Sequence, residues 1–181
     1  VDKYANLRCG YTYMFGHAGK KLLFMGQDFG QEREWSEERE LDWYLLGENL
    51  NKGLHEFVKE LLNIYRKYPC LYEFDNSWDG FEWLSCDDKD RSTYSFFRKS
   101  STGKNNLLFI INMTPMNWEG FQLGVPKKKK YKLLLSSTEE RFGGTGDLIP
   151  KEISAKKVSC DYRDYSITLD LPAYAAAIFV F

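Results

Sequence analysis

The sequence predicts an α/β segment followed by an all-β antiparallel sandwich, and three observations lead to this fold class. Apolar residues recur at helical spacing at the start of the chain and again over residues 54–65. Between these segments, residues 22–25 form an unbroken apolar run, which is typical of a parallel strand buried on both faces. Beyond Pro69 the pattern changes to short apolar runs separated by turn residues, which indicates a sandwich.

The first element is predicted to be a helix that ends near Gly16. Its apolar residues keep a helical spacing, and they are Tyr4, Leu7, Tyr11, Met14 and Phe15. Residues 16–19 include two glycines, which break this periodicity and are typical of a helix C-terminus. No capping box precedes the helix and the first residue is Val1, so we expect the sequence to have been cut from a longer one.

Residues 22–25 are the predicted buried strand, and residues 54–68 are the predicted second helix, which Pro69 ends. The polar segment 27–51 between them contains Trp35 and Trp43. It is too long for a simple connection and too aromatic for a disordered one, so we expect it to be functional. One buried parallel strand cannot form a sheet, so its neighbours are expected from residues outside this sequence or from another chain.

The remainder of the chain is predicted to form the β-sandwich. Its apolar runs are residues 81–84, 93–97, 107–111, 131–135, 166–171 and 175–181. Turn residues such as Thr102-Gly103 and Thr114-Pro115 separate these runs. We therefore predict two domains, residues 1–70 and residues 71–181.

Composition excludes several functional classes. The 25 basic residues nearly cancel the 26 acidic ones, so no overall field attracts nucleic acid or an anionic membrane, and a neutral partner is expected. No apolar run reaches the length of a membrane span. The four cysteines form no C-x-x-C pair and there are only two histidines, so neither a disulfide framework nor a metal site is indicated. A reducing, cytoplasmic location is the expectation.

Two motifs invite functional interpretations that their context does not support. The run 143–146, Gly-Gly-Thr-Gly, lacks the Lys-Ser or Lys-Thr pair of a phosphate loop, and no helical pattern follows it, so we interpret it as a β-turn. The four lysines of residues 127–130 lack interleaved aromatic residues and are typical of a solvated hairpin tip.

Tryptophans and carboxylates are the remaining candidates for ligand contact. Trp78, Trp83 and Trp118 could each stack on a sugar ring, although we expect two of the three to pack in the core. Most acidic residues of segment 28–42 are interpreted as a solvated face, with Asp28 and Asp42 as exceptions because apolar or aromatic residues flank them. His55 is interpreted as a surface residue at the start of the second helix, since no carboxylate partner is in view.

Several motifs, taken in order, resemble a known family along essentially the whole chain. They are Gly26-Gln27-Asp28-Phe29-Gly30-Gln31, Glu34-Trp35, Leu41-Asp42-Trp43, Tyr65-Arg66, Gly80-Phe81-Glu82-Trp83, Asn112-Met113-Thr114-Pro115, Gly124-Val125-Pro126 and Phe142-Gly143-Gly144-Thr145-Gly146. The sequence resembles the C-terminal portion of bacterial-type 1,4-alpha-glucan branching enzymes of the alpha-amylase superfamily.

This resemblance implies a fold. Members have a (β/α)8 barrel followed by a C-terminal all-β domain. Residues 1–70 would then be the end of the barrel, with residues 22–25 as its eighth strand between its last two helices. Ligand-contacting groups emerge at the C-terminal ends of barrel strands, which would explain why an apolar run turns abruptly polar at Gly26.

The resemblance also implies an activity. The family cleaves an α-1,4 bond of a glucan, holds a covalent glycosyl intermediate and transfers the chain to a 6-hydroxyl, which is a retaining double displacement. Its catalytic carboxylates are expected upstream of Val1, so no catalytic residue is assigned here and this chain alone is predicted to be inactive. No cofactor is implied, and the expected partners are α-glucan, such as glycogen or amylose-like chains, and the rest of the barrel.

What the resemblance carries over to this chain is substrate binding. The candidates are Gln27, Asp28, Trp35, Leu41, Asp42 and Trp43, with Trp78, Trp83 and Trp118 as possible surface glucan contacts. The family commonly has Glu at the position of Asp28, so a shorter carboxylate stands there. Two alternatives stay open, namely a non-catalytic glucan-binding or scaffolding module and the end of a related amylase-superfamily hydrolase.

Overall fold

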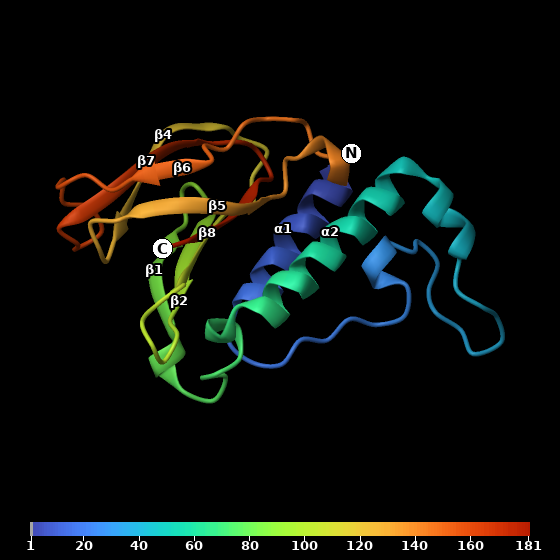
Figure 1. Ribbon diagram of the computed structural model, residues 1–181. Coiled ribbons are helices and arrows are strands. Elements are labelled where there is room, and N and C mark those ends of the chain that lie inside the picture. Colours follow the sequence, from blue (N-terminus) through green and yellow to red (C-terminus); the bar gives the residue numbers. More distant parts are fainter. Residues whose placement is uncertain (1) are drawn as a thin grey trace.

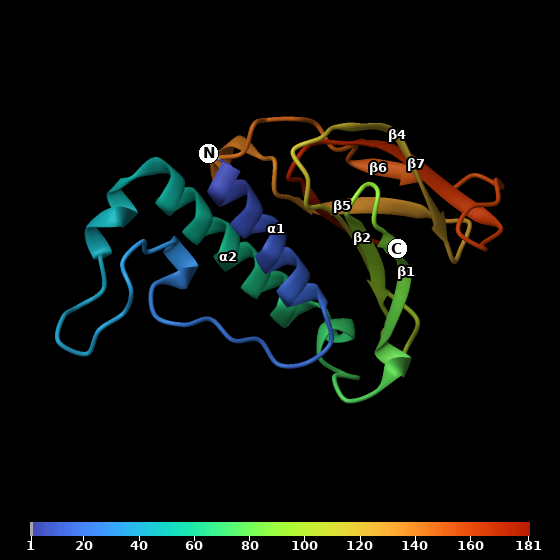
Figure 2. The ribbon, with the colours of Figure 1, turned by 180° about the vertical axis from the view of Figure 1, so that it is seen from behind.

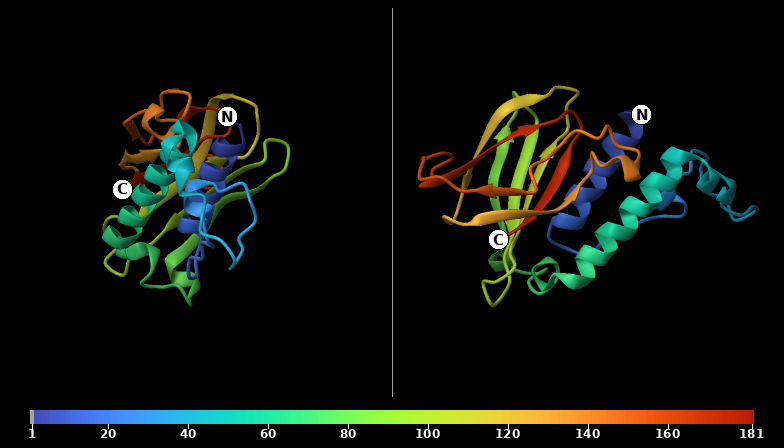
Figure 3. Two further views of the ribbon diagram at one scale, coloured as in Figure 1. Left: turned by 90° about the vertical axis from the view of Figure 1, so that its right-hand side faces the viewer. Right: turned by 45° about the horizontal axis from the view of Figure 1, so that its top comes forward.

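The computed structural model describes residues 2–181, which form two helices packed on one face of a β-structure (Figure 1). The helices are α1 (Asp2–Gly16) and α2 (Asn49–Lys67). The strands are β1 (Phe81–Asp88), β2 (Thr93–Arg98), β3 (Leu107–Asn112), β4 (Trp118–Val125), β5 (Lys130–Ser136), β6 (Glu152–Ser154), β7 (Tyr165–Leu171) and β8 (Ala176–Val180). Figure 3 shows the helix pair lying together beside the strands.

The strands form two antiparallel sheets. The larger has six strands in the order β1-β2-β3-β8-β5-β6, and the smaller pairs β4 with β7. Strand β3 lies in the middle of the larger sheet, and all six of its residues are buried. Its continuous apolar sequence follows from this position, because one face of β3 meets the smaller sheet and the other meets the helices. The predicted antiparallel all-β domain is thereby confirmed.

Alternation along the strands divides the larger sheet between two apolar cores. Leu108 and Ile110 of β3 point into the core shared with β4 and β7, together with Phe97 and Phe179. Their neighbours along the chain, such as Phe109, point into the core shared with the helices. Successive strand residues face opposite sides, so β1, β2, β3, β5 and β8 each contribute to both cores.

Helix α1 covers the larger sheet with a face that shares only Phe15 with its predicted apolar stripe. Its buried residues are Arg8, Cys9, Thr12, Phe15 and Gly16. Gly16 permits this close contact, because a Cβ there would lie 2.7 Å from the Phe109 ring. The other residues of the stripe, which are Tyr4, Leu7, Tyr11 and Met14, are half-buried and lie on a different face of the helix.

Helix α2 covers nearly all of the predicted residues 54–68 and buries the predicted face, but it begins earlier, at Asn49. Leu54, Phe57, Leu61 and Ile64 of its apolar face are buried, and the helix ends at Lys67, two residues before Pro69. It packs against α1 and against the short 3-10 turn Glu140–Phe142, so it contacts both the other helix and the β region.

The predicted strand over residues 22–25 is wrong for this structure. The segment is extended but pairs with no strand among residues 2–181, and Leu22, Phe24 and Met25 are 80%, 51% and 52% exposed. A parallel strand needs neighbours to satisfy its backbone groups, and within the described chain none lies beside it. Figure 2 shows the segment running outside the helix pair, away from both sheets, so the described chain contains no barrel.

Strands β4 and β6 were not predicted from the sequence. Gly120 and Gly124 interrupt the apolar pattern of β4, and β6 is only three residues long.

Neither α1 nor α2 combines the length and the apolar character needed to cross a bilayer, and no other helix in the described part of the chain does.

Candidate functional site

The loop of residues 24–48 carries the six substrate-binding candidates, and α1 and α2 hold its first turn in place. The Tyr4 hydroxyl of α1 donates to Asn51 Oδ1 of α2 at 2.8 Å, and Asn51 Nδ2 donates to the Phe29 carbonyl at 2.7 Å. Phe29 itself belongs to the loop, and its side chain is fully buried. One amide therefore links both helices to the backbone of the loop, which sequence analysis did not foresee because the three residues are far apart in the chain.

Glycines shape the turn that follows the apolar segment. Gly26 and Gly30 have φ angles of 76° and 70°, a left-handed conformation that glycine adopts without strain. Between them, Gln27 serves the loop itself, since its Oε1 accepts from Phe24 N at 2.8 Å. The Tyr11 hydroxyl donates to the Gln27 carbonyl at 2.7 Å. The amide nitrogen of Gln27 is the part of this side chain left for a ligand.

Asp28 pairs with a histidine across the loop. His55 Nδ1 of α2 lies 3.0 Å from Asp28 Oδ2, and the two side chains are 29% and 35% exposed. Both residues line a hollow of about 330 Å³ together with Leu41 and with Leu62 of α2. The carboxylate can accept from a ligand hydroxyl while it orients the imidazole. His55 was expected to have no carboxylate partner, and its contact with Asp28 is not visible in the sequence because the two residues are 27 positions apart.

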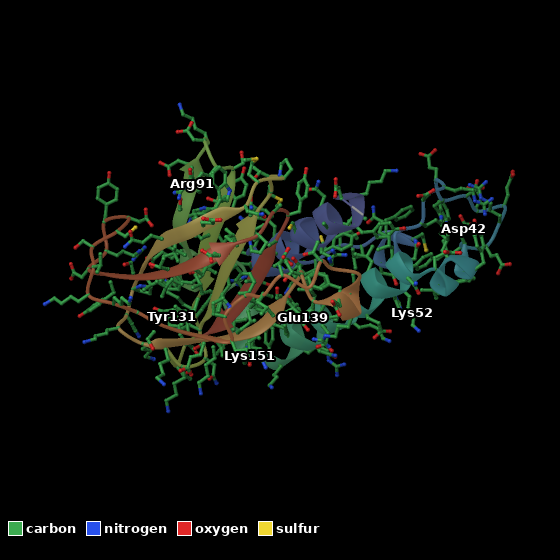
Figure 4. The ribbon with its side chains drawn as sticks, turned by 90° about the horizontal axis from the view of Figure 1, so that it is seen from above. Asp42, Lys52, Arg91, Tyr131, Glu139 and Lys151 are labelled. Atoms are coloured by element: carbon green, nitrogen blue, oxygen red, sulfur yellow. The ribbon has the colours of Figure 1, made fainter. Side chains whose placement is uncertain are left out.

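Asp42 is buried and already paired, in contrast to Asp28. Arg33 donates to both of its carboxylate oxygens, with Arg33 Nε 2.8 Å from Oδ2, and the backbone N–H of Asp42 donates to Gln31 Oε1 at 2.8 Å. The hydrogen bond from Arg33 lowers the pKa of Asp42 below its usual value. These contacts give Asp42 a role in holding the loop, which Figure 4 shows projecting away from the β-strands.

Trp35 and Trp43 are half-exposed, each with one aromatic neighbour. The Trp35 ring meets Phe24 edge to face at 5.5 Å between centroids, and the Trp43 ring lies 5.4 Å from that of the buried Phe29. The exposed fractions of the two side chains are 39% and 51%. Each ring is therefore supported from one side and leaves apolar surface for a planar or ring-shaped ligand.

The other three tryptophans lie in the β region. Trp78 is 84% exposed, in a short 3-10 turn before β1. Trp83 is partly buried in an aromatic cluster with His17 and Phe96, and Trp118 is half-buried against the core between the sheets. Their roles as glucan contacts stay predictions.

The candidates do not converge on one concave site. Asp28 and Leu41 share the hollow over α2, whereas Gln27 lines a second hollow of about 520 Å³ over α1. Trp35, Asp42 and Trp43 line neither of these hollows. Within residues 2–181, no three His, Cys, Asp or Glu side chains are grouped so that they could hold a metal ion.

A comparison with protein families identifies the β region. Residues 83–181, more than half of the chain, match the alpha amylase C-terminal all-beta domain. The chain belongs to this family. The matched residues include most of β1 and every later strand, so the family corresponds to the two-sheet structure described above.

Curated relatives match the chain over nearly its full length. It is 64% identical over all 181 residues to the 1,4-alpha-glucan branching enzyme GlgB of Butyrivibrio fibrisolvens, and it spans 28% of that protein. It is 38% identical over 179 residues to GlgB 1 of Clostridium perfringens strain 13, spanning 27% of that relative. The resemblance to branching enzymes is thereby confirmed, and the chain spans little more than a quarter of these relatives.

Solved structures share the fold at low sequence identity. The chain matches the crystal structure of AmyP in complex with maltose with a TM-score of 0.63 at 13% identity, covering 98% of this chain and 35% of that one. It matches a mutant of the trehalulose synthase MutB with a TM-score of 0.58 at 12% identity, covering 98% of this chain and 38% of that one. The helix pair and the strands together are thus an arrangement found in other proteins.

Proposed function

We propose that this chain is part of a glycogen branching enzyme, which cleaves an α-1,4-linked glucan and transfers the released chain to a 6-hydroxyl to form an α-1,6 branch. The observation that carries the proposal is the 64% identity to a 1,4-alpha-glucan branching enzyme over all 181 residues. The identity extends through the helices and the loop as well as the β region, so it concerns more than a shared C-terminal domain.

Residues 1–70 are proposed to be the end of the (β/α)8 barrel, and residues 71–181 the C-terminal domain. The exposure of Leu22, Phe24 and Met25 supports this assignment, because an apolar run of this kind is suited to a buried parallel strand. The half-buried stripe of α1 supports it as well. The partner of both surfaces is then the remainder of the barrel, and the location is the cytoplasm.

The loop of residues 24–48 is proposed to contact glucan at the ligand-binding face of that barrel. Asp28 accepts from sugar hydroxyls, and the exposed faces of Trp35 and Trp43 pack on the C–H faces of pyranose rings. The catalytic carboxylates of the retaining double displacement belong to the remainder of the barrel. The 181-residue chain alone is therefore expected to bind glucan weakly and to transfer nothing.

Proton NMR of amylose incubated with the longest native chain that contains residues 1–181 tests this function. New α-1,6 anomeric signals at constant total reducing ends are expected from the long chain and not from the 181-residue chain. Rising reducing ends without α-1,6 signals would instead make the parent protein a hydrolase.

A second candidate function is a glucan-binding module without catalysis, which Trp78 favours because its ring is 84% exposed and can pack on a sugar. In this case the 181-residue chain by itself is retarded in an amylopectin gel, and the long chain forms no α-1,6 bonds. Unretarded migration of the 181-residue chain removes this candidate.

A further inference from the structure

A hollow on the β region lies apart from the loop of residues 24–48. It has a volume of about 220 Å³ and is lined by residues from the start of β4, the end of β7 and the loop that follows the 3-10 turn Glu140–Phe142. Trp118, the first residue of β4, pairs with Leu171, the last residue of β7. The space is smaller than the roughly 300 Å³ or more of a pocket for a drug-sized molecule, so it suits a single ring.

The polar side chains of this hollow are held by local hydrogen bonds. The β4–β7 register shifts between Trp118 and Phe121, where Gly120 has a φ of 60°, and the Gly120 N–H donates to Asp170 Oδ1 at 2.7 Å. The Ala173 N–H donates to Asn117 Oδ1 at 2.8 Å. Each of these contacts uses one atom of the side chain and leaves the second carboxylate oxygen or the amide nitrogen without a partner in residues 2–181.

The loop that follows the 3-10 turn Glu140–Phe142 also brings an unpaired carboxylate oxygen to the hollow. Thr145 Oγ1 donates to Asp147 Oδ2 at 2.6 Å, which leaves Asp147 Oδ1 without a partner in the described chain. Leu148 is 90% exposed and forms an apolar lip. Asp147 and Leu148 therefore place a hydrogen-bond acceptor next to an apolar surface.

Trp118 adds an aromatic ring to the hollow. The ring packs partly against the core between the sheets, and its Nε1 is buried without a hydrogen-bond partner among the described residues. Because this nitrogen is buried, the part of Trp118 that lines the hollow for a ligand is the ring.

The charge of the hollow restricts its ligand. Glu119, Asp147 and Asp170 line it, and no Lys or Arg does, so anions are repelled. No three acidic, His or Cys side chains among residues 2–181 are placed to hold a metal ion. The chemistry that remains is a neutral molecule with many hydroxyl donors and an apolar face, which describes a pyranose ring.

We propose that this hollow binds a glucosyl residue of an α-glucan chain, with its C–H face on Trp118 and Leu148 and its hydroxyls donating to Asp147 and Asp170. The proposal rests on the proposed function, because it names a second contact surface for the same substrate. A glucan in this hollow is held by the β region while another part of the same glucan lies at the loop of residues 24–48.

The test compares three variants of the longest native chain that contains residues 1–181, by affinity electrophoresis in amylopectin gels. Leu148→Arg fills the hollow from an exposed position, so it leaves folding intact. Trp118→Phe replaces the indole with a smaller ring and so reduces the aromatic surface on which the C–H face of the sugar packs. We expect the dissociation constant to rise about tenfold for the first variant and about fivefold for the second, the latter corresponding to the lost aromatic contact. Tyr162→Ala, in a fully exposed turn outside the hollow, is the matched control and keeps wild-type affinity.

Hydroxyl-radical footprinting with maltoheptaose gives a second, local measurement. Labelling of Leu148 is expected to fall several-fold when the sugar is bound, while labelling of Tyr162 stays constant. Unchanged labelling of Leu148, or protection by Ca²⁺ in place of maltoheptaose, overturns the proposal. Amylose branching by the wild-type long chain is followed in parallel. If α-1,6 bonds form and Leu148 is not protected, only this inference fails, whereas absence of α-1,6 bonds counts against the proposed function.

Discussion

At the scale of single residues, a few buried charges decide how distant segments meet. Arg8 of α1 is 2% exposed and donates to the carbonyls of Ser137, Phe142 and Gly143, at 2.9, 2.9 and 3.4 Å. The Gly143 carbonyl belongs to the Gly-rich run 143–146 that is predicted to be a turn, and the other two precede this run. The guanidinium supplies donors to backbone groups that have left the regular strand pattern.

Arg8→Met is therefore expected to destabilise the chain strongly. Three carbonyls would lose their donor in a buried place, and a loss of about 3 kcal/mol or more in the free energy of unfolding is expected, measured by urea titration. Arg66→Met, on the exposed side of α2, is the matched control and is expected to change stability by less than about 0.5 kcal/mol. Equal effects of the two substitutions would show that the Arg8 contacts contribute nothing specific.

The Arg33–Asp42 pair leads to a pH-dependent prediction. The hydrogen bond from Arg33 lowers the pKa of Asp42 in the folded chain. A carboxyl with a lowered folded-state pKa stabilises the fold above its unfolded pKa, and this contribution disappears as the pH falls through the folded value. The free energy of unfolding of the wild type should therefore decrease more steeply than that of Asp42→Asn from about pH 6 to about pH 2.

Urea titrations at several pH values measure this difference. Glu38→Gln, an exposed carboxyl of the same loop, serves as the control and should retain the wild-type slope. Parallel curves for the wild type and Asp42→Asn would contradict a role for this pair in holding the loop.

At the scale of elements, the contact between α2 and the segment after β5 depends on the absence of a side chain. A Cβ at Gly53 of α2 would lie 2.6 Å from the Phe142 carbonyl carbon and 2.9 Å from Gly143 N. Gly10 of α1 is also a helical glycine, but a Cβ there would have no neighbour within 4 Å. A methyl group at position 53 would therefore collide with backbone atoms, whereas one at position 10 has free space.

Gly53→Ala and Gly10→Ala are expected to change stability in opposite directions. Gly10→Ala should stabilise the chain by up to about 1 kcal/mol, because alanine loses less conformational freedom in a helix than glycine does. Gly53→Ala should destabilise it by about 1–3 kcal/mol, because the backbone of residues 142–143 must move away. Thermal unfolding followed by circular dichroism measures both. A stabilising Gly53→Ala would mean that this helix and the β region are not in close contact.

At the scale of the whole molecule, the two ends differ in character. The strands enclose their apolar residues, whereas the far side of the helix pair presents Leu22, Phe24 and Met25 to solvent. In Figure 4 the loop with Asp42 lies at the opposite end from Tyr131 of β5. An exposed apolar run of this kind indicates a surface that another part of a protein covers.

The triple variant Leu22→Ser, Phe24→Ser, Met25→Ser tests this asymmetry. In the 181-residue chain it should reduce self-association in sedimentation experiments and weaken binding of an apolar dye. In the longest native chain it should lower the unfolding temperature, because each buried apolar side chain contributes about 1.5–3 kcal/mol. Tyr162→Ser is the control for an exposed ring elsewhere. An unchanged unfolding temperature of the long chain would show that nothing covers residues 22–25.

The sequence by itself determined the elements that depend on local patterns. Helix α2 follows from the spacing of its apolar residues, and the end of α1 follows from the two glycines of residues 16–19. The sequence also predicted β1, β2, β3, β5, β7 and β8 as short apolar runs between turn residues. It also determined the family, because motifs in a fixed order survive without knowledge of any contact.

Only the tertiary structure decided which predicted candidates are paired and which surfaces are open. The Asp28–His55 contact, the Arg33–Asp42 pair and the three bonds of Arg8 join residues that are 9 to 135 positions apart, and no spacing rule predicts such partners. The apolar run of residues 22–25 has the composition of a buried strand, yet it stays unpaired in the described chain. A strand exists only where neighbouring backbones supply its hydrogen bonds, and that condition lies outside the run itself.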